Sequence, residues 1–512
     1  MTEHYLDRLA KTITENWDQP ALTDFYLTED GTAQDTSRGN HYTYGKMYAE
    51  ILRLGELFNT LGMQKGDHIA ISGANSAHWA VAYLSIAAYQ GVAVTILHGQ
   101  SSEDIAHQID FSDSKALFTD EDLWEEMKDQ SLPQVEYVIS LEDWQILRGR
   151  EIPIPNGKSI IDKREVRFVH GEPDELAMIC FTSGSTSVSK GVKLSSLNIS
   201  NNIKDFHNLY PISDINTYLS LCPFAHLSGF MGDLVSQLTL GKHLNMLLEI
   251  PNVAYIHSVM MILKPYMYIS VPQVFVSLLH TYGETIFSDL VPFCKLIYVG
   301  GAPLNRIDEE RICNSPIPLA IVYGQTETGA SIAISPYKHH RLTSCGKIVE
   351  GMTARIADNG EILVKGENVM LGYYKDPEAT ARKIDKDGWL HTGDKGHLDE
   401  DGYLYVEGRL EQDMIVLPNG ENIHPEDIER KINALPEVKE SIVLARDGKL
   451  VAIVVPKITN DQSSMTNTDL RRMILRKVNP ELPLYSQLYD VEITDIPLAK
   501  TEKQTLKRYL YK

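Results

Sequence analysis

CFTSGSTSVSKGVKLS, from Cys180 to Ser195, is the most informative segment of this chain. It completes an apolar run, Ala177 to Phe181, that is typical of a buried strand. A loop rich in Thr, Ser and Gly follows and closes on Lys190 and Gly191. Hydroxyls, exposed backbone N–H groups and a lysine can together bind phosphate. The segment therefore predicts a strand that leads into the phosphate-binding loop of a nucleotide site.

The Walker P-loop, GxxxxGK(S/T), is the first alternative for this segment. Gly184 and Lys190 have the Walker spacing. Ser189 replaces the second glycine, however, and Gly191 stands where the magnesium-binding Ser or Thr belongs. The segment thus departs from the Walker pattern at two of its defining positions.

Composition limits the class of protein. A chain of 512 residues is too long for one core and should form two or more domains. Its net charge of −21 argues against a nucleic-acid partner, which requires a basic surface. The cysteines are few and contain no CxxC pair, which favours free thiols in a reducing cytoplasm. They are Cys180, Cys222, Cys294, Cys313 and Cys345.

No segment has the pattern of a signal peptide or a transmembrane helix. The N-terminal residues 1–17 lack a continuous apolar core. The most apolar stretch, Trp79 to Leu97, is interrupted by Gln90 and Gly91 and predicts a buried helix followed by a strand. We expect a cytoplasmic protein that is a monomer or a homodimer.

Helical and strand-like patterns alternate along most of the chain, which predicts an α/β fold. Expected strands at residues 295–299 and 319–323 each end in a glycine-containing loop, GGAP and GQTE. Such loops line the carboxyl edge of an open α/β sheet, so we expect both to share one crevice with the loop of residues 182–191. After Gly408 a compact segment with strand and helix patterns follows. We place the domain boundary there, with a large multi-subdomain α/β domain at 1–408 and a small α+β domain at 409–512.

Several motifs occur in a fixed order and together resemble the adenylate-forming superfamily, which includes acyl-CoA synthetases, adenylation domains and luciferases. The phosphate loop of that superfamily is TSGTTGxPKG, and the differences of this chain from it include Ser187 for Gly and Ser189 for Pro. The other motifs are Gly300–Pro303 (GGAP), Tyr323–Glu327 (YGQTE), Gly366–Tyr373 (GENVMLGY), Asp387–Asp394 (DGWLHTGD) and Gly402–Arg409 (GYLYVEGR). The resemblance implies a large AMP-binding domain and a small, mobile C-terminal domain.

ATP presents phosphates, a flat adenine and a ribose diol, and the motifs supply groups suited to each. Loop hydroxyls suit the phosphates, Gly301 allows close backbone approach to the adenine, and Tyr323 offers an aromatic face. The Asp394 carboxylate can accept from both ribose hydroxyls, and Arg409 would reinforce the ribose or phosphate contact. The resemblance implies that Gly420, in PNGENIHP, enters the tunnel for the pantetheine of coenzyme A. The complete expected nucleotide- and cofactor-binding set is Thr182, Ser183, Gly184, Ser185, Thr186, Lys190, Gly301, Ala302, Pro303, Tyr323, Gly324, Gln325, Thr326, Asp394, Arg409 and Gly420.

Three further residues are the expected catalytic set. Glu327 is the expected Mg²⁺ ligand, because Mg²⁺ binds one or two carboxylates together with phosphate oxygens. His226, in LCPFAHLSGF, corresponds to the His that the family places between the acyl pocket and the phosphates; a buried core histidine is the alternative. Aligning Pro497 with the family's PxTxxGKxxR motif makes Lys503 the catalytic lysine, with Lys500 as the competing choice.

The resemblance implies an ATP-dependent acid–CoA ligase, and the IVLPNGENIHPEDIE segment is most similar to fatty acyl-CoA ligases. The carboxylate attacks the α-phosphate, pyrophosphate leaves, and coenzyme A then displaces AMP. A stand-alone acyl-AMP ligase, an amino-acid or aryl-acid adenylating enzyme and a luciferase-like oxygenase remain alternatives. A nucleotide-binding pseudoenzyme is the alternative of another class. The sequence does not identify the acid.

Overall fold

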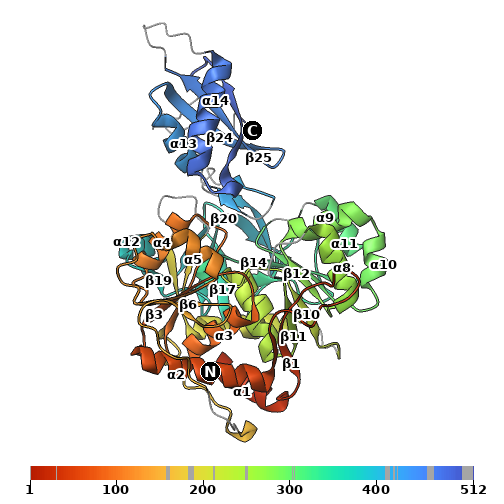
Figure 1. Ribbon diagram of the computed structural model, residues 1–512. Helices are drawn as coiled ribbons and strands as arrows, with labels where there is room; N and C mark the ends of the chain where they lie inside the picture. Colours follow the sequence, from red (N-terminus) through yellow and green to blue (C-terminus); the bar gives the residue numbers. More distant parts are fainter. Residues whose placement is uncertain are drawn as a thin grey trace. The chain divides into compact units, whose positions relative to one another are not determined.

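The computed structural model divides into two compact units, each of which is described by itself (Figure 1). The larger unit comprises residues 1–181, 191–392 and 396–407, and the smaller comprises residues 182–190, 393–395 and 408–512. The fold is mixed α/β with a large N-terminal and a smaller C-terminal domain, which confirms the predicted fold class. The structure describes residues 2–29, 31–156, 162–182, 190–210, 214–247, 252–302, 304, 306–409, 415–418, 421–423, 425–457, 466–498 and 511.

An eight-stranded sheet lies in the larger unit. In order, its strands are β19 (Gly372–Tyr373), β9 (Gly191–Ser195), β8 (Leu176–Phe181), β4 (Val92–Thr95), β3 (His68–Ser72), β5 (Ala116–Thr119), β6 (Tyr137–Ser140) and β7 (Ile146–Arg148). The five strands from β8 to β6 are parallel, and antiparallel strands close both edges. The crossovers between successive parallel strands are α3 (Ala77–Ala88), α4 (Ser102–Phe111) and α5 (Glu121–Met127).

Local sequence explains several of these elements. β3 covers the predicted residues 68–72, and β8 covers the predicted apolar run before the phosphate loop. Ser76 caps α3 by accepting the N–H of Trp79, whose side chain is completely buried. The stretch from Trp79 to Leu97 is therefore a buried helix followed by a strand, as predicted.

Two other sheets complete the larger unit. The four-stranded sheet has the order β10 (Thr217–Ser220), β11 (His243–Met246), β1 (Pro20–Asp24) and β2 (His41–Thr43). The nine-stranded sheet has the order β12 (Tyr268–Ser270), β13 (Ile297–Gly300), β14 (Leu319–Tyr323), β15 (Ala333–Ile334), β16 (Gly346–Ile348), β21 (Tyr403–Arg409), β20 (Leu390–Leu398), β18 (Glu361–Gly366) and β17 (Met352–Ile356).

The strands that carry the predicted loops are distributed over two sheets. β13 and β14 are adjacent parallel strands in the nine-stranded sheet, so the GGAP and GQTE loops leave the same edge. β8 belongs to the eight-stranded sheet. Residues 183–189 of the phosphate loop lie outside the described residues, so a crevice shared by all three loops stays a prediction.

Helices cover these sheets, and three apolar cores lie among the described residues of the larger unit. The first joins the eight-stranded sheet to the N-terminal helices, and the second lies between β12–β14 and a group of helices beside them (Figure 1). The third packs α4 and α5 against the eight-stranded sheet. The helices not yet given are α1 (Tyr5–Glu15), α2 (Tyr44–Leu61), α6 (Ser196–Leu209), α7 (Ser236–Thr239), α8 (Val253–Leu263), α9 (Pro272–Tyr282), α10 (Thr285–Leu290), α11 (Arg306–Cys313) and α12 (Pro377–Lys383). The predicted helical pattern of residues 51–61 forms the C-terminal part of α2.

The smaller unit has its own core. Two helices, α13 (Pro425–Asn433) and α14 (Asn467–Val478), pack against the three-stranded sheet of β24 (Val438–Arg446), β25 (Lys449–Pro456) and β26 (Leu488–Ile493) (Figure 1). β24 and β25 are antiparallel, whereas α14 connects β25 to the parallel β26. A separate hairpin pairs β22 (Ile415–Val416) with β23 (Asn422–Ile423). The sequence predicted α13, β24 and β25 with small errors at their ends.

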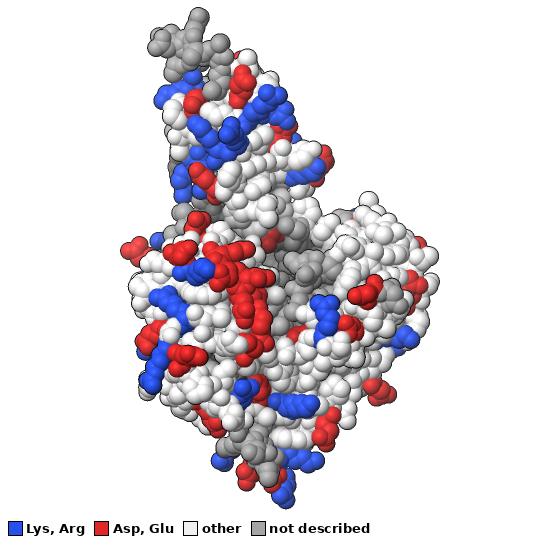
Figure 2. Space-filling view, viewed as in Figure 1, with Lys and Arg blue, Asp and Glu red and all other residues white. Residues whose placement is uncertain are grey.

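The molecular surface agrees with the charge argument. Acidic side chains run as a stripe over one face of the larger unit (Figure 2), in line with the net charge of −21. Such a face repels a nucleic-acid backbone. Across the part of the chain that the structure describes, no helix is both long and apolar enough to span a bilayer.

Candidate active site

The YGQTE segment forms a compact loop after β14. Gly324 leaves no room for a side chain, because a Cβ there would lie 1.9 Å from the carbonyl oxygen of Ala330. The Thr328 hydroxyl accepts the Gln325 N–H at 3.1 Å and donates to the Gln325 carbonyl at 3.0 Å. Ala330 has a φ of +133°, a strained conformation for a residue with a side chain. These contacts hold Glu327 on a single short 3₁₀ turn.

The Glu327 carboxylate is oriented by a residue from β19. Its Oε1 accepts a 2.6 Å hydrogen bond from the hydroxyl of Tyr373, whose side chain is buried. The Met370 N–H also donates to the Glu327 carbonyl at 2.9 Å. Among the described residues, no other group bonds the carboxylate. The N–H after that of Met370, which belongs to Leu371, donates to the carbonyl of Lys193 on β9 at 2.9 Å, which places the Glu327 turn beside β9.

The GGAP loop leaves β13 beside this turn. Gly300 pairs with Val322 of β14, and a Cβ on Gly300 would lie 3.2 Å from the Val322 carbonyl oxygen. Gly301 has a φ of +83°, which favours glycine. Gly301 therefore follows β13 at the same end of the sheet at which Tyr323 ends β14. The roles of Gly301, Ala302 and Tyr323 in binding adenine stay predictions. Pro303 lies outside the described residues.

Gln325 connects the turn to β20. Its side-chain amide donates to the Thr392 carbonyl at 2.8 Å, and Lys383 Nζ donates to Gln325 Oε1 at 3.2 Å. Thr392 is itself buried and bonds the Ile362 carbonyl at 2.7 Å. The predicted ribose ligand Asp394 follows two residues later on β20 and is also buried.

His226 lies near the carboxyl edge of the eight-stranded sheet. The carbonyl before it, that of Ala225, accepts from the Cys180 thiol at 3.6 Å and from the Thr95 hydroxyl at 3.5 Å. The imidazole is exposed and its Nδ1 bonds Ser228 Oγ at 2.8 Å. The surrounding protein nevertheless lowers the pKa of His226. A catalytic role for His226 stays a prediction.

A buried aspartate supports the chain segment that leads to His226. Asp233, on a π-helical turn at Gly229–Val235, accepts the Tyr218 hydroxyl at 2.8 Å and the Ser220 hydroxyl at 3.0 Å. It also accepts the N–H groups of Leu221 and Cys222 at 3.1 and 3.0 Å. Burial raises the pKa of this carboxyl to about 7, well above its usual value.

We expect Asp233→Asn to change the pH dependence of stability. Because the folded pKa lies above the unfolded value, protonation favours the folded state, and this contribution is lost as the pH rises from about 4 to about 7. Asparagine does not titrate. As the pH rises from 4 to 8, the free energy of unfolding of the variant should therefore increase by on the order of 2–4 kcal/mol relative to that of wild type. Melting temperatures at four pH values measure this difference. The exposed Asp174→Asn serves as control, and parallel profiles for Asp233→Asn and wild type would contradict the prediction.

Several predicted residues lie outside the described part of the chain. They are Ser183, Gly184, Ser185, Thr186, Pro303, Gly420 and both candidate lysines, Lys500 and Lys503. Arg409 ends β21, and its side chain is not described. Thr182 and Lys190 are described, and the Thr182 N–H donates to the Lys190 carbonyl at 3.1 Å. Their roles in binding the nucleotide stay predictions.

The residues at Glu327 fit a magnesium ion held jointly with nucleotide phosphates. Within the described ranges, no group of three or more His, Cys, Asp or Glu side chains could hold a metal alone. A single oriented carboxylate with one oxygen available suits Mg²⁺, which completes its shell with phosphate oxygens and water.

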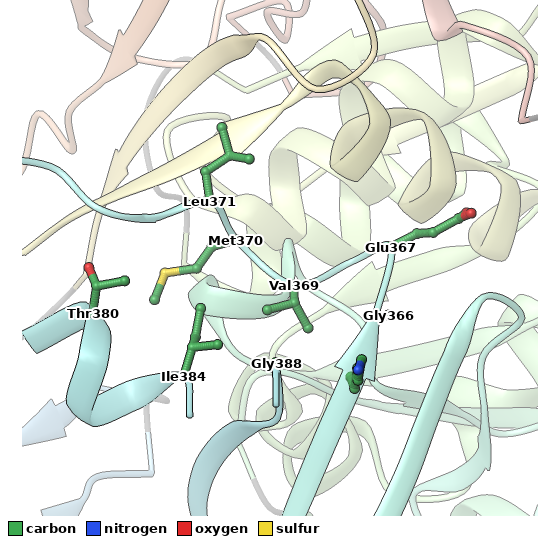
Figure 3. A pocket seen from close by; sticks show the side chains of 9 residues that line it. Gly366, Glu367, Val369, Met370, Leu371, Thr380, Ile384 and Gly388 are labelled. Carbon is green, nitrogen blue, oxygen red and sulfur yellow. The ribbon is translucent and has the colours of Figure 1, made fainter. Parts of the chain in front are cut away.

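A cavity of about 620 Å³ lies beside the Gly366–Tyr373 segment in the larger unit (Figure 3). Its lining includes the apolar side chains of Val369, Met370 and Ile384 and the charged residues Lys365 and Glu367. None of the predicted site residues lines it.

Comparison with known proteins gives two family matches. The AMP-binding enzyme family matches residues 9–374, and the AMP-binding enzyme C-terminal domain family matches residues 412–511. A methyl-dioxo-octahydroindenyl-propanoyl:CoA ligase of Rhodococcus jostii is 28% identical over 78% of this chain and 80% of its own length. A long-chain-fatty-acid–CoA ligase of Mycobacterium bovis is 26% identical over 75% of this chain and 72% of its own length.

Solved structures share the fold. A double mutant of o-succinylbenzoate CoA synthetase from Bacillus subtilis, bound with a product analogue, superimposes with a TM-score of 0.77. The comparison covers 99% of this chain and 98% of that one at 23% sequence identity.

Proposed function

The chain belongs to the AMP-binding enzyme family, and from this premise we propose that it is an AMP-forming acid–CoA ligase. The observation that carries the proposal is the Glu327 carboxylate, oriented by Tyr373 beside the GGAP loop. The relatives support the reaction class, because their names specify CoA ligases that act on chemically different acids. A fatty acid is our proposal for the substrate, on the similarity of residues 415–429.

We propose a reaction in two halves. In the first, the substrate carboxylate attacks the α-phosphorus of ATP, an acyl-adenylate forms and pyrophosphate leaves. In the second, the thiol of coenzyme A attacks the acyl carbon and AMP leaves. Thr182 and Lys190 would bind the phosphates, Asp394 the ribose, and Lys503 would stabilise charge that develops on the phosphoryl oxygens.

Glu327 would hold magnesium together with the phosphate oxygens of ATP. When bound, the ion supplies charge neutralisation on the phosphoryl oxygens. The side chain of Gln325 donates a hydrogen bond to the Thr392 carbonyl, and this bond would hold the turn that carries Glu327 against β20. His226 is proposed to separate the acyl group from the phosphates. We also propose the domain boundary at residues 408/409, mobility of the C-terminal domain and a cytoplasmic location.

ATP–pyrophosphate exchange across a panel of carboxylic acids tests the function. We expect exchange with at least one acid, and the preferred acid identifies the substrate class. Formation of the acyl-CoA from that acid supports the ligase. Exchange that stops at the acyl-adenylate with coenzyme A present favours the stand-alone acyl-AMP ligase. ATP binding without exchange for any acid favours the pseudoenzyme.

Glu327→Gln should raise the magnesium concentration needed for half-maximal exchange by about 10-fold or more. The amide keeps the shape of the side chain but removes its charge, so metal binding weakens while binding of metal-free ATP should not change. Exchange rates over a magnesium titration and calorimetry with ATP in chelator measure the two effects. Glu367→Gln, an exposed glutamate of the Gly366–Tyr373 segment, is the control. Unchanged magnesium dependence would remove Glu327 from the metal site.

A further inference from the structure

One face of α6 is polar although it is buried. Asn198, Asn201, Asn202 and Asp205 follow one another at helical spacing, and each is at most 4% exposed. A buried helix face is normally apolar, because an unpaired polar group in the interior costs about 1–3 kcal/mol. Each of these four side chains therefore needs a partner. We call this set the α6 polar face.

The α6 polar face binds the segment that leads to Tyr373. Asn198 Nδ2 donates to the carbonyls of Glu367 and Val369 at 2.6 and 3.1 Å. Asn201 Nδ2 donates to Asn368 Oδ1 at 2.7 Å, and Asn368 Nδ2 donates to Asp205 at 3.1 Å. Asn368 is completely buried. These bonds fix the backbone from residue 367 to 369.

The same face binds the other side of the Glu327 turn. Asn202 Oδ1 accepts the Ser331 hydroxyl at 2.7 Å and the Ser331 N–H at 3.1 Å, and Asn202 Nδ2 donates to the Thr328 carbonyl at 3.4 Å. Asn368 links the two segments, because its Nδ2 also donates to the Ser331 carbonyl at 3.1 Å. One helix face therefore holds both segments whose side chains meet at Glu327.

We propose that Tyr373 is a positioning residue for the Glu327 carboxylate. Its segment is held by the α6 polar face at residues 367–369, and Tyr373 itself by pairing with Val192 and by the bond from its N–H to the Thr380 hydroxyl at 2.9 Å. The hydroxyl bond of 2.6 Å holds one carboxylate oxygen, so the other oxygen would bind the metal. A hydrogen bond of this kind to a metal-binding carboxylate typically changes metal affinity by about 10- to 100-fold. The inference rests on the proposed role of Glu327.

Tyr373→Phe tests the inference, because it removes only the hydroxyl. Mn²⁺ serves as the probe, and its free concentration is measured by electron paramagnetic resonance in the presence of the full-length chain and ATP. We expect the affinity for Mn²⁺ with ATP to fall by about 10-fold or more. The affinity for ATP in chelator and the melting temperature should stay at wild-type values. A purely structural role would lower the melting temperature and leave the metal affinity unchanged.

Tyr374→Phe is a matched control on the next residue. The Tyr374 hydroxyl donates to Asp113 at 2.7 Å and does not contact Glu327, so its removal should leave Mn²⁺ affinity unchanged. A double-mutant cycle completes the test. If Tyr373 acts through Glu327, adding Tyr373→Phe to Glu327→Gln should have no further effect on Mn²⁺ affinity.

The outcomes separate the inference from the proposed function. Equal Mn²⁺ affinities for wild type and Tyr373→Phe, or additive effects in the cycle, would overturn the positioning role. If wild type binds Mn²⁺ no better with ATP than in its absence, the role of Glu327 in the proposed function fails first. The inference is supported if Tyr373→Phe binds Mn²⁺ more weakly than wild type and if the same substitution causes no further loss of Mn²⁺ affinity in Glu327→Gln.

Discussion

Lys503→Ala should lower the rate of acyl-adenylate formation by about 100- to 1,000-fold and leave the second half-reaction nearly intact. A lysine near the transferring phosphoryl group would stabilise charge that exists only as the adenylate forms, so its loss should lower kcat more than the affinity for ATP. Pyrophosphate exchange measures the first half-reaction. Thioester formation from a supplied acyl-adenylate measures the second.

The matched variant for this prediction is Lys500→Ala. Both lysines fall in the segment that resembles the family's PxTxxGKxxR motif, and the alignment of Pro497 selects Lys503. Lys500→Ala should therefore keep exchange within a few-fold of wild type. If Lys500→Ala loses exchange while Lys503→Ala retains it, the alignment is wrong by three residues.

Local chemistry made much of the fold predictable. A short run of apolar and β-branched residues forms a strand largely irrespective of its surroundings, which explains the match at β3 and β14. Gly301, with its positive φ, and Gly324, with its excluded Cβ, are equally local requirements. The loops that these glycines permit could therefore be located before the structure.

The division into sheets was not predictable from these patterns. β8 and β13 have similar local sequences, yet they lie in different sheets because strand pairing depends on contacts between distant segments. The expectation of one crevice assumed that all three loops leave a single open sheet, whereas the strands that carry them belong to two different sheets. Only the β13–β14 part of that expectation is confirmed.

The partners of the predicted site residues were also missed. Tyr373 and Glu327 are 46 residues apart, and Lys383 and Gln325 are 58 apart, so no local spacing connects them. The α6 polar face was hidden for another reason. Polar residues at helical spacing ordinarily indicate a solvated face, whereas here they are buried against two loops. The usable signal was the unusual run of asparagines in SLNISNN.

Gly420→Trp should block thioester formation and spare adenylate formation. Gly420 falls in PNGENIHP, the segment that resembles the entrance of the pantetheine tunnel. An indole there would fill the path of the thiol, while the first half-reaction needs no thiol. The resemblance implies that the C-terminal domain uses different faces in the two halves, so a lesion on one face should not damage the other.

Product analysis in a single reaction with ATP, the preferred acid and coenzyme A measures this effect. We expect Gly420→Trp to accumulate the acyl-adenylate. Acyl-CoA formation should fall by at least about 100-fold, because the indole would prevent the thiol from reaching the acyl carbon. Gly420→Ala, which adds one methyl group, should retain most of the activity. Equal loss of both half-reactions in Gly420→Trp would instead indicate a general folding defect. Normal acyl-CoA formation would show that the thiol reaches the acyl-adenylate by a path that excludes Gly420.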